Sequence, residues 1–449
     1  MGDSSKNYEV PIGKVFENLS LKKAHYVVFF ILLVTVVIDS MEATYVSLLL
    51  PAFEKYFSAS HLSAATVLSI PFLAAIIGAV FWGNVSDYLG RKKMLVTAYF
   101  SYGVLNFIAA FSTSMSELLI FRTLAFFMFA GAVVISFPYL QEFMPTKIRG
   151  RMLNILLAAT PVGVLIATEI AILVLPHFNW QGVFIVMSFL SLWGFVILFF
   201  MNESPYWLTK VGNLQKARKV IYEFASRDEL IDTVGIDLEN VVLTTEKSKK
   251  VPMSVVWSRK YIGVTIMVGI IAFTYAFGYW GIFAWIPGYL ISRGVHYSVA
   301  LEYEIIYALC AMPGYALSAY LMEKPKIGRK SVSIVFLVIT ALSTVAFLNV
   351  GTVLEAILAL AVLSFFSNGI WGTLDAWFPE QYPTEARGAG NGWALAMERI
   401  APATAPLFVG AFLSVSGGTS IITIVLFSMI VLAVIGSVFL KETRGVDLV

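Results

Sequence analysis

Seven ionisable side chains stand inside stretches of the sequence that are otherwise long and apolar. They are Asp39, Glu42, Arg122, Glu169, Asp375, Glu398 and Arg399. A charged side chain near the centre of a bilayer costs roughly 2.5–3.5 kcal/mol, so these residues are expected to face a watery cavity or one another. The set contains five acids and two bases, so three carboxyl groups have no cationic partner. A carboxyl group without a cation in an apolar site tends to keep its proton. This excess predicts a protein that moves protons together with a solute.

Two of the acids, Asp39 and Glu42, stand three residues apart in the run "VVIDSMEATYVSLLLP". On a helix this spacing puts both on one face and close enough to repel, so we expect them to titrate as a coupled pair. Glu398 and Arg399 are adjacent and would point about 100° apart on a helix. We expect one of them to pair with a neighbouring helix. Glu169 lies towards the end of its span, where an interfacial position is equally open.

Aromatic side chains with polar handles are concentrated in the segment "FTYAFGYWGIFAWIPGYL" (273–290), among glycines that allow bending. A second segment, 368–375, offers an amide, an indole and a carboxylate at spacings of three and four, which is one helix face. Such rings suit sugars and aromatic substrates equally, although each could serve bundle packing instead. The candidate substrate-binding residues are Tyr275, Tyr279, Trp280, Asn368, Trp371, Asp375, Glu398 and Arg399.

The elements that must position these residues are transmembrane helices. Hydrophobic residues make up 59% of the 449 residues, charged residues 13%, and the mean hydropathy is +0.82. A soluble domain has a charged fraction nearer a quarter. Apolar stretches of about 20 residues, enough to cross a ~30 Å core, predict twelve spans. They are roughly 24–50, 62–84, 94–112, 117–143, 152–176, 180–201, 261–291, 298–322, 331–350, 354–379, 389–413 and 418–440.

The basic residues predict the orientation of these spans. Of the 31 Lys and Arg residues, Lys55 and Arg293 fall in outer loops, two lie within spans, and the other 27 lie on the opposite side. The positive-inside rule then places both termini in the cytoplasm, which suits a multi-pass plasma membrane protein. No removable signal peptide is expected. The single Cys310 forms no intrachain disulfide and says nothing about redox compartment.

The chain reads as two similar halves. "LGRKK" (89–93) matches "IGRKS" (327–331), and "EFMPTKIRG" (142–150) matches "EQYPTEARG" (380–388). Both matches have the same shift, which takes position 90 to 328 and position 142 to 380. One constant shift indicates duplication, and two six-helix bundles around a midplane site are typical of transporters. We predict an all-α membrane protein with bundles at 1–201 and 261–449. A cytoplasmic loop at 202–260 would hold a short amphipathic helix behind Asn213.

These motifs resemble a known family. "GNVSDYLGRKK" (83–93) is similar to the loop signature of the major facilitator superfamily, while "NESPYWL" and "KETRG" resemble motifs of its sugar porters. "DSMEATYVSLLLP" and "WGTLDAWFPEQYP" are similar to the branch that holds synaptic vesicle glycoprotein 2, organic-ion transporters and bacterial niacin transporters. The resemblance implies a secondary active transporter that works by alternating access.

The resemblance also implies a cytoplasmic gate of charged residues at helix ends. Its members are Asp87, Arg91, Glu142, Arg149, Arg329, Glu380 and Arg387, joined by Glu203 and Glu442. Partly desolvated pairs of this kind could latch the closed state, or could be static. The repeat shift takes Asp87 to Pro325, where only Glu323 could substitute. The second copy of the gate is therefore expected to be degraded.

The resemblance further assigns roles inside the membrane. Arg122 stands twenty residues before Glu142, as in sugar porters, where it partners the helix 1 acid. This implies Asp39 as proton acceptor and Arg122 as the cation that competes with the proton, unless their bridge is permanent and structural. Organic-ion transporters use a cation on helix 11 for anionic substrates, which implies a substrate role for Arg399. The adjacent Glu398 weakens that role.

The function predicted from the sequence is secondary active transport of a small polar solute, a sugar or an organic acid, by proton symport. An exporter working as an antiporter, and a substrate-binding receptor that does not transport, remain open. An enzyme is excluded because the sequence has no His-Glu-x-x-His motif, no phosphate-binding loop and only four His. We expect no catalytic residue, metal or cofactor. The expected partners are the solute, protons and the lipid bilayer, with no nucleic acid, and the default state is a monomer.

Overall fold

The computed structural model describes residues 8–17, 19–145, 147–235, 237–238, 241–244, 252–324 and 327–444. Most of them lie in helices. The sheet structure of these residues is one parallel pair of short strands, β1 (Tyr8–Pro11) and β2 (Val241–Thr244). The predicted all-α membrane fold is confirmed.

The first half of the chain builds one bundle. Its helices are α2 (Lys23–Phe57), α3 (His61–Leu89), α4 (Arg91–Ala109), α5 (Met115–Phe143), α6 (Arg149–Leu157), α7 (Thr160–Ser188), η1 (Phe189–Leu192) and α8 (Trp193–Phe200). Inside α7, Asn179 has a φ of +53° and breaks the helix. Its ψ of −166° lies outside the helical regions of the backbone map. The chain therefore turns back at Asn179, and the sixth span begins at Trp180.

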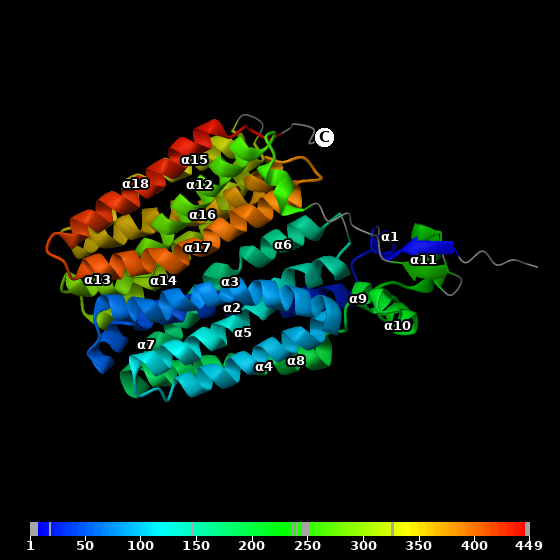
Figure 1. Cartoon of the computed structure of the whole chain (residues 1–449), viewed down its shortest axis with the longest axis horizontal. Coiled ribbons are helices and arrows are strands. Elements are labelled where there is room, and N and C mark those ends of the chain that lie inside the picture. The colour runs from blue at the N-terminus through cyan, green and yellow to red at the C-terminus, as the bar shows by residue number, and fades with distance from the viewer. Residues whose placement is uncertain are drawn as a thin grey trace, which may run out of the picture.

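The second half builds the other bundle. Its helices are α12 (Ile262–Phe283), α13 (Ile286–Ser292), α14 (Tyr297–Met322), α15 (Gly328–Leu348), α16 (Val353–Glu380), α17 (Arg387–Leu413) and α18 (Gly418–Phe439). Figure 1 shows the bundles side by side, the first in blue to blue-green and the second in green to red.

Within the described residues, nine helical stretches are long and apolar enough to cross a membrane. One of them, Arg149–Phe200, has 52 residues and turns back at Asn179, so it crosses twice. The helices α4 and α17 are more polar because α4 begins with three basic residues and α17 carries Glu398 and Arg399. With these two helices the fold has the predicted twelve spans in two bundles.

Several of the long helices begin at a side chain that satisfies a free backbone N–H group. Ser60 accepts from the N–H of Ser63 at the start of α3, and Ser114 accepts from the N–H of Glu117 at the start of α5. Thr352 forms a reciprocal capping box at the start of α16. These caps lie in the sequence immediately before apolar runs, so the sequence itself marks where the spans begin.

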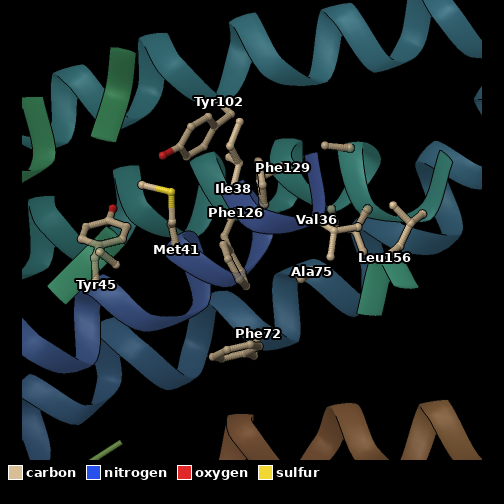
Figure 2. Packing of buried hydrophobic residues seen from close by; sticks show 14 of the residues in the cluster. Val36, Ile38, Met41, Tyr45, Phe72, Ala75, Tyr102, Phe126, Phe129 and Leu156 are labelled. Atoms are coloured by element: carbon tan, nitrogen blue, oxygen red, sulfur yellow. The ribbon is translucent and has the colours of Figure 1, made fainter. Parts of the chain in front are cut away.

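Aromatic and aliphatic side chains fill the first bundle. Figure 2 shows side chains of α2, α3, α4, α5 and α6 meeting in one cluster, with Met41 and Tyr45 on α2 and Phe129 on α5. The side chains of Tyr45 and Tyr102 are fully buried there. Dense packing of this kind keeps the helices that face the second bundle in fixed positions.

One glycine in each bundle allows two neighbouring helices to approach closely. A Cβ on Gly163 of α7 would lie 2.3 Å from the carbonyl oxygen of Val37 on α2. A Cβ on Gly314 of α14 would lie 2.0 Å from the carbonyl oxygen of Phe365 on α16. Small residues at membrane helix contacts permit such backbone approach. All four helices face the space between the bundles, so these contacts help to shape it.

A small domain lies at one end of the first bundle (Figure 1). Its elements are β1, α1 (Ile12–Val15), α9 (Pro205–Lys210), α10 (Leu214–Phe224), α11 (Arg227–Val234) and β2, and η3 (Met253–Trp257) leads from it into α12. The amphipathic helix predicted behind Asn213 is confirmed, since the Asn213 side chain accepts from the N–H of Lys216. The segment 8–22 was predicted as part of the first bundle, but β1 pairs with β2 and α1 is buried against this domain.

Candidate functional site

A cavity of about 800 Å³ lies between the two bundles. Its walls come from α2, α3, α5, α6 and α7 on one side and from α12, α14, α16 and α17 on the other. The lining runs from Asp39 and Glu398 in the middle of their helices, past Asp375 in the last turns of α16, to Gly150, Glu323 and Arg329 at the helix ends. We call this end the motif end, because both copies of the repeated charged motifs lie there. The cavity therefore opens at the motif end.

The opposite end is closed by contacts between the bundles. The Tyr297 hydroxyl donates to the carbonyl oxygen of Leu48 at 2.5 Å. The His61 ring meets the Trp285 ring edge to face at 5.8 Å between centroids. These contacts join α2 to α14 and α3 to the α12–α13 break, so a solute in the cavity can leave only towards the motif end.

Charged residues from both bundles face the middle of the cavity. Asp39 on α2 lies across from Arg399 on α17, close enough for their charges to interact. Asp375 and Glu398 also line the wall. Arg399 makes no ion pair or hydrogen bond with another residue that the structure describes. The centre of the cavity therefore combines three carboxyl groups with one guanidinium that is free to meet a solute.

Glu398 and Arg399 both line the cavity, and neither forms the predicted ion pair with a neighbouring helix among the described residues. Leu395, Glu398, Arg399 and Pro402 all contribute to the wall. Spacings of three, four and seven residues form one stripe about 100° wide on a helix. The cavity follows this whole stripe of α17, and adjacent residues at its two edges both reach it.

The predicted pair of Asp39 and Arg122 is not formed in the structure. Arg122 binds Glu42 and not Asp39: its Nη1 lies 2.6 Å from Glu42 Oε2, and its Nη2 donates to the Glu42 backbone oxygen at 3.0 Å. The hydroxyl of Tyr102 donates to the other Glu42 oxygen. Arg122 also lies 4.8 Å from the centroid of the Tyr45 ring. Both charges are almost completely buried within the first bundle.

The geometry of α2 explains why Asp39 and Glu42 separate. Three residues on a helix leave a rotation of about 60° and a rise of about 4.5 Å. That rotation turns Glu42 inward to Arg122 on α5 and Tyr102 on α4, while Asp39 faces the cavity. Because Arg122 is already bound, Asp39 has no basic partner in its own bundle among the described residues.

Four of the predicted aromatic and amide residues line the cavity: Tyr279, Trp280, Asn368 and Trp371. Tyr275 does not, because its hydroxyl donates to the Ser367 carbonyl oxygen and its ring packs 5.0 Å from that of Trp371. Tyr275 is therefore buried and packs within the bundle, so it does not make the predicted contact with substrate.

The amide of Asn368 is already engaged within the protein. Its oxygen lies 3.3 Å from the Tyr279 hydroxyl and 3.1 Å from the Tyr307 hydroxyl, and these two hydroxyls also contact each other. Its nitrogen donates to the Ser364 carbonyl oxygen at 2.9 Å. Asn368 therefore holds two tyrosines in position.

Several site residues were missed from the sequence. Phe72, Phe126, Tyr307 and Tyr315 line the cavity; Tyr307 and Tyr315 share a face of α14, and their spacing of eight residues could have revealed them. Glu302 and Glu304 were overlooked although both fall in the predicted span 298–322.

Glu304 is 3% exposed, whereas Glu302 is exposed. No sequence signal points to Tyr102, which lies 60 residues from its partner Glu42. Glu169 is exposed and does not line the cavity.

At the motif end the two halves repeat one arrangement of charges. Arg91 Nε lies 2.7 Å from Glu142 Oε1, and Arg329 Nε lies 2.6 Å from Glu380 Oε2. Asp87 adds a second contact to Arg91 at 3.4 Å. Its counterpart at the repeat shift, Pro325, lies outside the described residues.

Two further acids bind the first backbone N–H groups of helices at this end. Glu203 accepts from the N–H of Lys92, and Glu442 accepts from the N–H groups of Arg329 and Lys330. A carboxylate is favourable at a helix N-terminus.

Two predicted gate arginines do not join these ion pairs. Arg149 Nε donates to the Met144 carbonyl oxygen at 2.9 Å, and two buried nitrogens of Arg387 have no partner among the described residues. Each ion pair described at the motif end lies within one bundle. A latch between the bundles at this end is therefore a prediction for the state in which the motif end is closed.

Comparison with protein families matches residues 31–326 and 303–447 to the Major Facilitator Superfamily. The chain belongs to the major facilitator superfamily. It is a multi-pass membrane transporter and not an enzyme.

Two relatives and one solved structure illustrate the similarity. The niacin transporter NiaP of Acinetobacter baylyi is 28% identical over 96% of this chain and 97% of its own. A synaptic vesicle 2-related protein of Bos taurus is 24% identical over 91% of this chain and 76% of its own. The crystal structure of a D-xylose–proton symporter superposes with a TM-score of 0.73 at 18% identity, covering 94% of this chain and 99% of that one. At that identity the structure shows a common fold.

Proposed function

We propose that this transporter carries a small aromatic carboxylic acid, of the pyridine-carboxylate type, together with protons into the cytoplasm. The observation that carries the proposal is Arg399, a cavity-lining guanidinium without a partner among the described residues, placed among aromatic rings and opposite Asp39. A guanidinium binds a carboxylate through two parallel hydrogen bonds, which suits an anionic substrate better than a sugar.

The aromatic wall supports a flat substrate. Trp280, Tyr279 and Trp371 line the second bundle's side of the cavity, and Phe72 faces Trp280 from the first bundle at 5.2 Å between centroids. Aromatic rings stack on one another or meet edge to face with a gain of about 0.5–1.5 kcal/mol per pair. A volume of about 800 Å³ is within the range of small-molecule sites and leaves room for water.

Coupling to protons follows from competition for Arg399. An ionised Asp39 attracts Arg399 across the cavity and repels a substrate carboxylate. When Asp39 takes up a proton, both effects end and the guanidinium becomes available to the substrate. Proton and anion therefore bind cooperatively, and by linkage each favours the binding of the other. A proton and a carboxylate anion that enter together carry no net charge, so the pH difference across the membrane drives accumulation, with about 1.4 kcal/mol for each pH unit.

The orientation of the transporter in the membrane is supported by the charges at the two ends, and proton symport then carries the substrate towards the cytoplasm. The motif end carries Arg91, Lys92, Arg329 and Lys330 and the small domain, which the positive-inside rule assigns to the cytoplasm. The plasma membrane is the corresponding location. The relative of A. baylyi is named a niacin transporter, and niacin is a pyridine carboxylate, so its name agrees with a substrate chosen on the charge of Arg399.

The experiment is uptake into proteoliposomes of radiolabelled nicotinate, benzoate, nicotinamide and xylose, with and without an inward proton gradient. Nicotinate and benzoate are expected to accumulate only with the gradient, and uncharged nicotinamide and xylose are not. Arg399→Gln should lose carboxylate uptake roughly tenfold to hundredfold, the equivalent of a lost charged hydrogen bond. Arg259→Gln, which changes an exposed arginine outside the cavity, should leave uptake unchanged.

Two results would overturn the proposal. Accumulation of carboxylates by Asp39→Asn at the wild-type level would remove Asp39 from the coupling. Failure of every carboxylate, with uptake of a quaternary ammonium probe, would favour an organic cation as substrate. The second candidate is supported by the three acids, Asp39, Asp375 and Glu398, that line the same cavity. Exchange in the absence of a gradient distinguishes a carrier from a receptor.

A further inference from the structure

Glu304 is a buried acid that the transport mechanism above does not use. It lies on α14, two turns from the helix start at Tyr297, and its side chain is 3% exposed. Its Oε1 has no hydrogen-bond partner, and neither oxygen forms an ion pair or a side-chain hydrogen bond with another described residue. One turn further along α14, Tyr307 already lines the cavity. Glu304 therefore stands between the cavity and the closed opposite end.

The described groups around Glu304 supply no positive charge. On α12, Tyr279 is close enough for an electrostatic interaction with Glu304. Tyr303 and Tyr307 lie on the same helix as Glu304. On α13, Arg293 binds the Tyr289 hydroxyl and the Leu348 carbonyl oxygen at 2.8 and 3.0 Å.

The acids near this end of the other packed elements are engaged or exposed, and Asp375 of α16 lies in the cavity further towards the motif end. On α2, Glu54 pairs with His61 at 2.7 Å. Glu169 on α7 and Glu355 on α16 are exposed. An ionised carboxylate without a cation or sufficient hydrogen bonds is strongly disfavoured in an apolar interior. Glu304 in this conformation is therefore compatible with the neutral, protonated form.

The position of Glu304 couples its protonation to the conformation of the transporter. Tyr297 and Leu301, seven and three residues before Glu304 on α14, take part in the seam between the bundles. This seam is made by Tyr297 with Leu48 and by the cluster of Leu48, Ala171 and Leu301. Alternating access opens this seam and admits water to α14, and a hydrated carboxyl can lose its proton. By linkage, a proton bound at Glu304 stabilises the closed opposite end.

We propose that Glu304 is a proton-binding site of the second bundle that takes its proton when the opposite end is open and locks that end shut once protonated. The inference rests on alternating access, which the family shares, and not on the substrate proposed above. The Tyr279 and Tyr307 hydroxyls, which contact each other and Asn368, connect the site to the cavity wall.

The first test observes the proton directly. Infrared spectra of the full-length protein in lipid nanodiscs at neutral pH contain a carbonyl band for each protonated carboxyl group. The difference between wild type and Glu304→Gln should show one such band, which shifts in D₂O. Glu302→Gln, an exposed acid two residues away, is the matched control and should retain it. Identical spectra of wild type and Glu304→Gln would mean that Glu304 is ionised and would overturn the proposal.

The second test reads the conformation. Spin labels at Ser116 and Ser416, exposed positions of the two bundles at the opposite end, report its opening in a Cys310→Ser background. Raising the pH should increase the long-distance population in wild type and in Glu302→Gln. Glu304→Gln, which imitates the protonated acid, should keep the short distance over more of the pH range. The same pH dependence in wild type and Glu304→Gln would contradict the lock.

Neither readout needs a substrate, so failure here is separate from failure of the proposed function. Glu304→Asp covers the possibility that the amide variant does not fold. It keeps a carboxyl group, and its infrared band should persist at a shifted position. Loss of the band in a monodisperse Glu304→Asp protein would count against the proposal.

Discussion

The two bundles share a fold and a repeated set of motifs, but they treat buried charge in opposite ways. The first bundle neutralises its buried acid, since Glu42 binds Arg122 and the Tyr102 hydroxyl. The second bundle keeps its buried acids Glu304 and Glu398 without an ion pair among the described residues.

At the repeat shift that relates the charged motifs, neither arrangement has a counterpart in the other half. Glu42 and Arg122 correspond to Trp280 and Leu360, whereas Glu304, Asp375 and Glu398 correspond to Thr66, Phe137 and Thr160. The motif ends of the bundles, by contrast, repeat the same Arg–Glu pair. Duplication thus preserved the parts that hold helix ends together, and the interior of each half acquired its own chemistry.

The comparison suggests that the two bundles have different roles in transport. A charge pair that is fully buried and hydrogen-bonded resists change, because separating it would leave a charge in an apolar interior. Acids without a partner can gain or lose a proton as their surroundings become wet or dry. We infer that the first bundle supplies a rigid wall with Asp39 at its face and that the second bundle carries most of the groups that respond to protons.

The largest effect should come from breaking the buried pair of the first bundle. Glu42→Gln or Arg122→Met alone leaves one uncompensated charge, and we expect a loss of about 3–5 kcal/mol of stability. The double variant should recover much of that loss, since no buried charge remains. Thermal unfolding in detergent measures both. A single variant as stable as wild type would show that the first bundle does not depend on the pair.

A smaller effect should come from the glycine contacts, which test what the bundles have in common. Gly163→Ala in the first bundle and Gly314→Ala in the second place a methyl group against a backbone oxygen at 2.3 and 2.0 Å. We expect each to lose about 1–3 kcal/mol, the usual cost of overpacking. Gly388→Ala, where nothing lies within 4 Å, is the control. Unequal losses in thermal unfolding would show that the bundles are held differently.

The small domain, which has no copy in the second half, should depend on pH through Glu229. Lys22 Nζ lies 2.6 Å from Glu229 Oε2, and Ser20 donates to Oε1. Partial burial raises the pKa of Glu229, but the hydrogen bonds from Lys22 and Ser20 outweigh it and lower the pKa to about 2.

A lowered pKa means that the contact stabilises the folded state above the usual value near 4.5 and is lost as the pH falls towards 2. We expect limited proteolysis after residue 22 to accelerate over that window, and Glu229→Gln to remove the dependence. Because the pair is near the surface, Lys22→Ala should cost about 0.2–1 kcal/mol at neutral pH. Cleavage that does not respond to pH would show that the apolar contacts of α1 hold the segment alone.

The smallest effect on stability should come from the acids of the second bundle. Asp375→Asn and Glu398→Gln remove no ion pair, so we expect thermal stability within about 0.5 kcal/mol of wild type. Transport and its pH dependence should change in both. A loss of several kcal/mol, comparable to that of Glu42→Gln, would mean that these acids are structural and that the contrast between the bundles is wrong.

Much of the fold could be predicted from the sequence, because membrane spans are signalled locally. The twelve apolar runs, the caps at Ser60 and Ser114 and the amphipathic helix behind Asn213 each depend on neighbouring residues only. The repeat also predicted that Arg91 and Arg329 occupy equivalent places, and each binds an acid of its own bundle, Glu142 and Glu380 respectively.

The candidate site could be predicted in part. Asp39, Asp375, Glu398 and Arg399 line the cavity as expected from charges that must avoid lipid. Tyr275 does not line it, because aromatic residues in a bundle serve packing as readily as binding. Glu304 was missed although its charge was visible in the sequence.

The sequence by itself determined that this chain crosses a membrane twelve times in two related halves, and that acids outnumber bases within its spans. Only the tertiary structure decided that Arg122 binds Glu42 and that Asp39 therefore faces Arg399. It also decided that β1, which precedes the first bundle in the sequence, pairs with β2, which follows it. The physical reason is that hydropathy is summed along about 20 residues of one helix, whereas a charge pair depends on how two helices are rotated against each other. A rotation of about 60°, the difference between Asp39 and Glu42, changes the partner without changing the span.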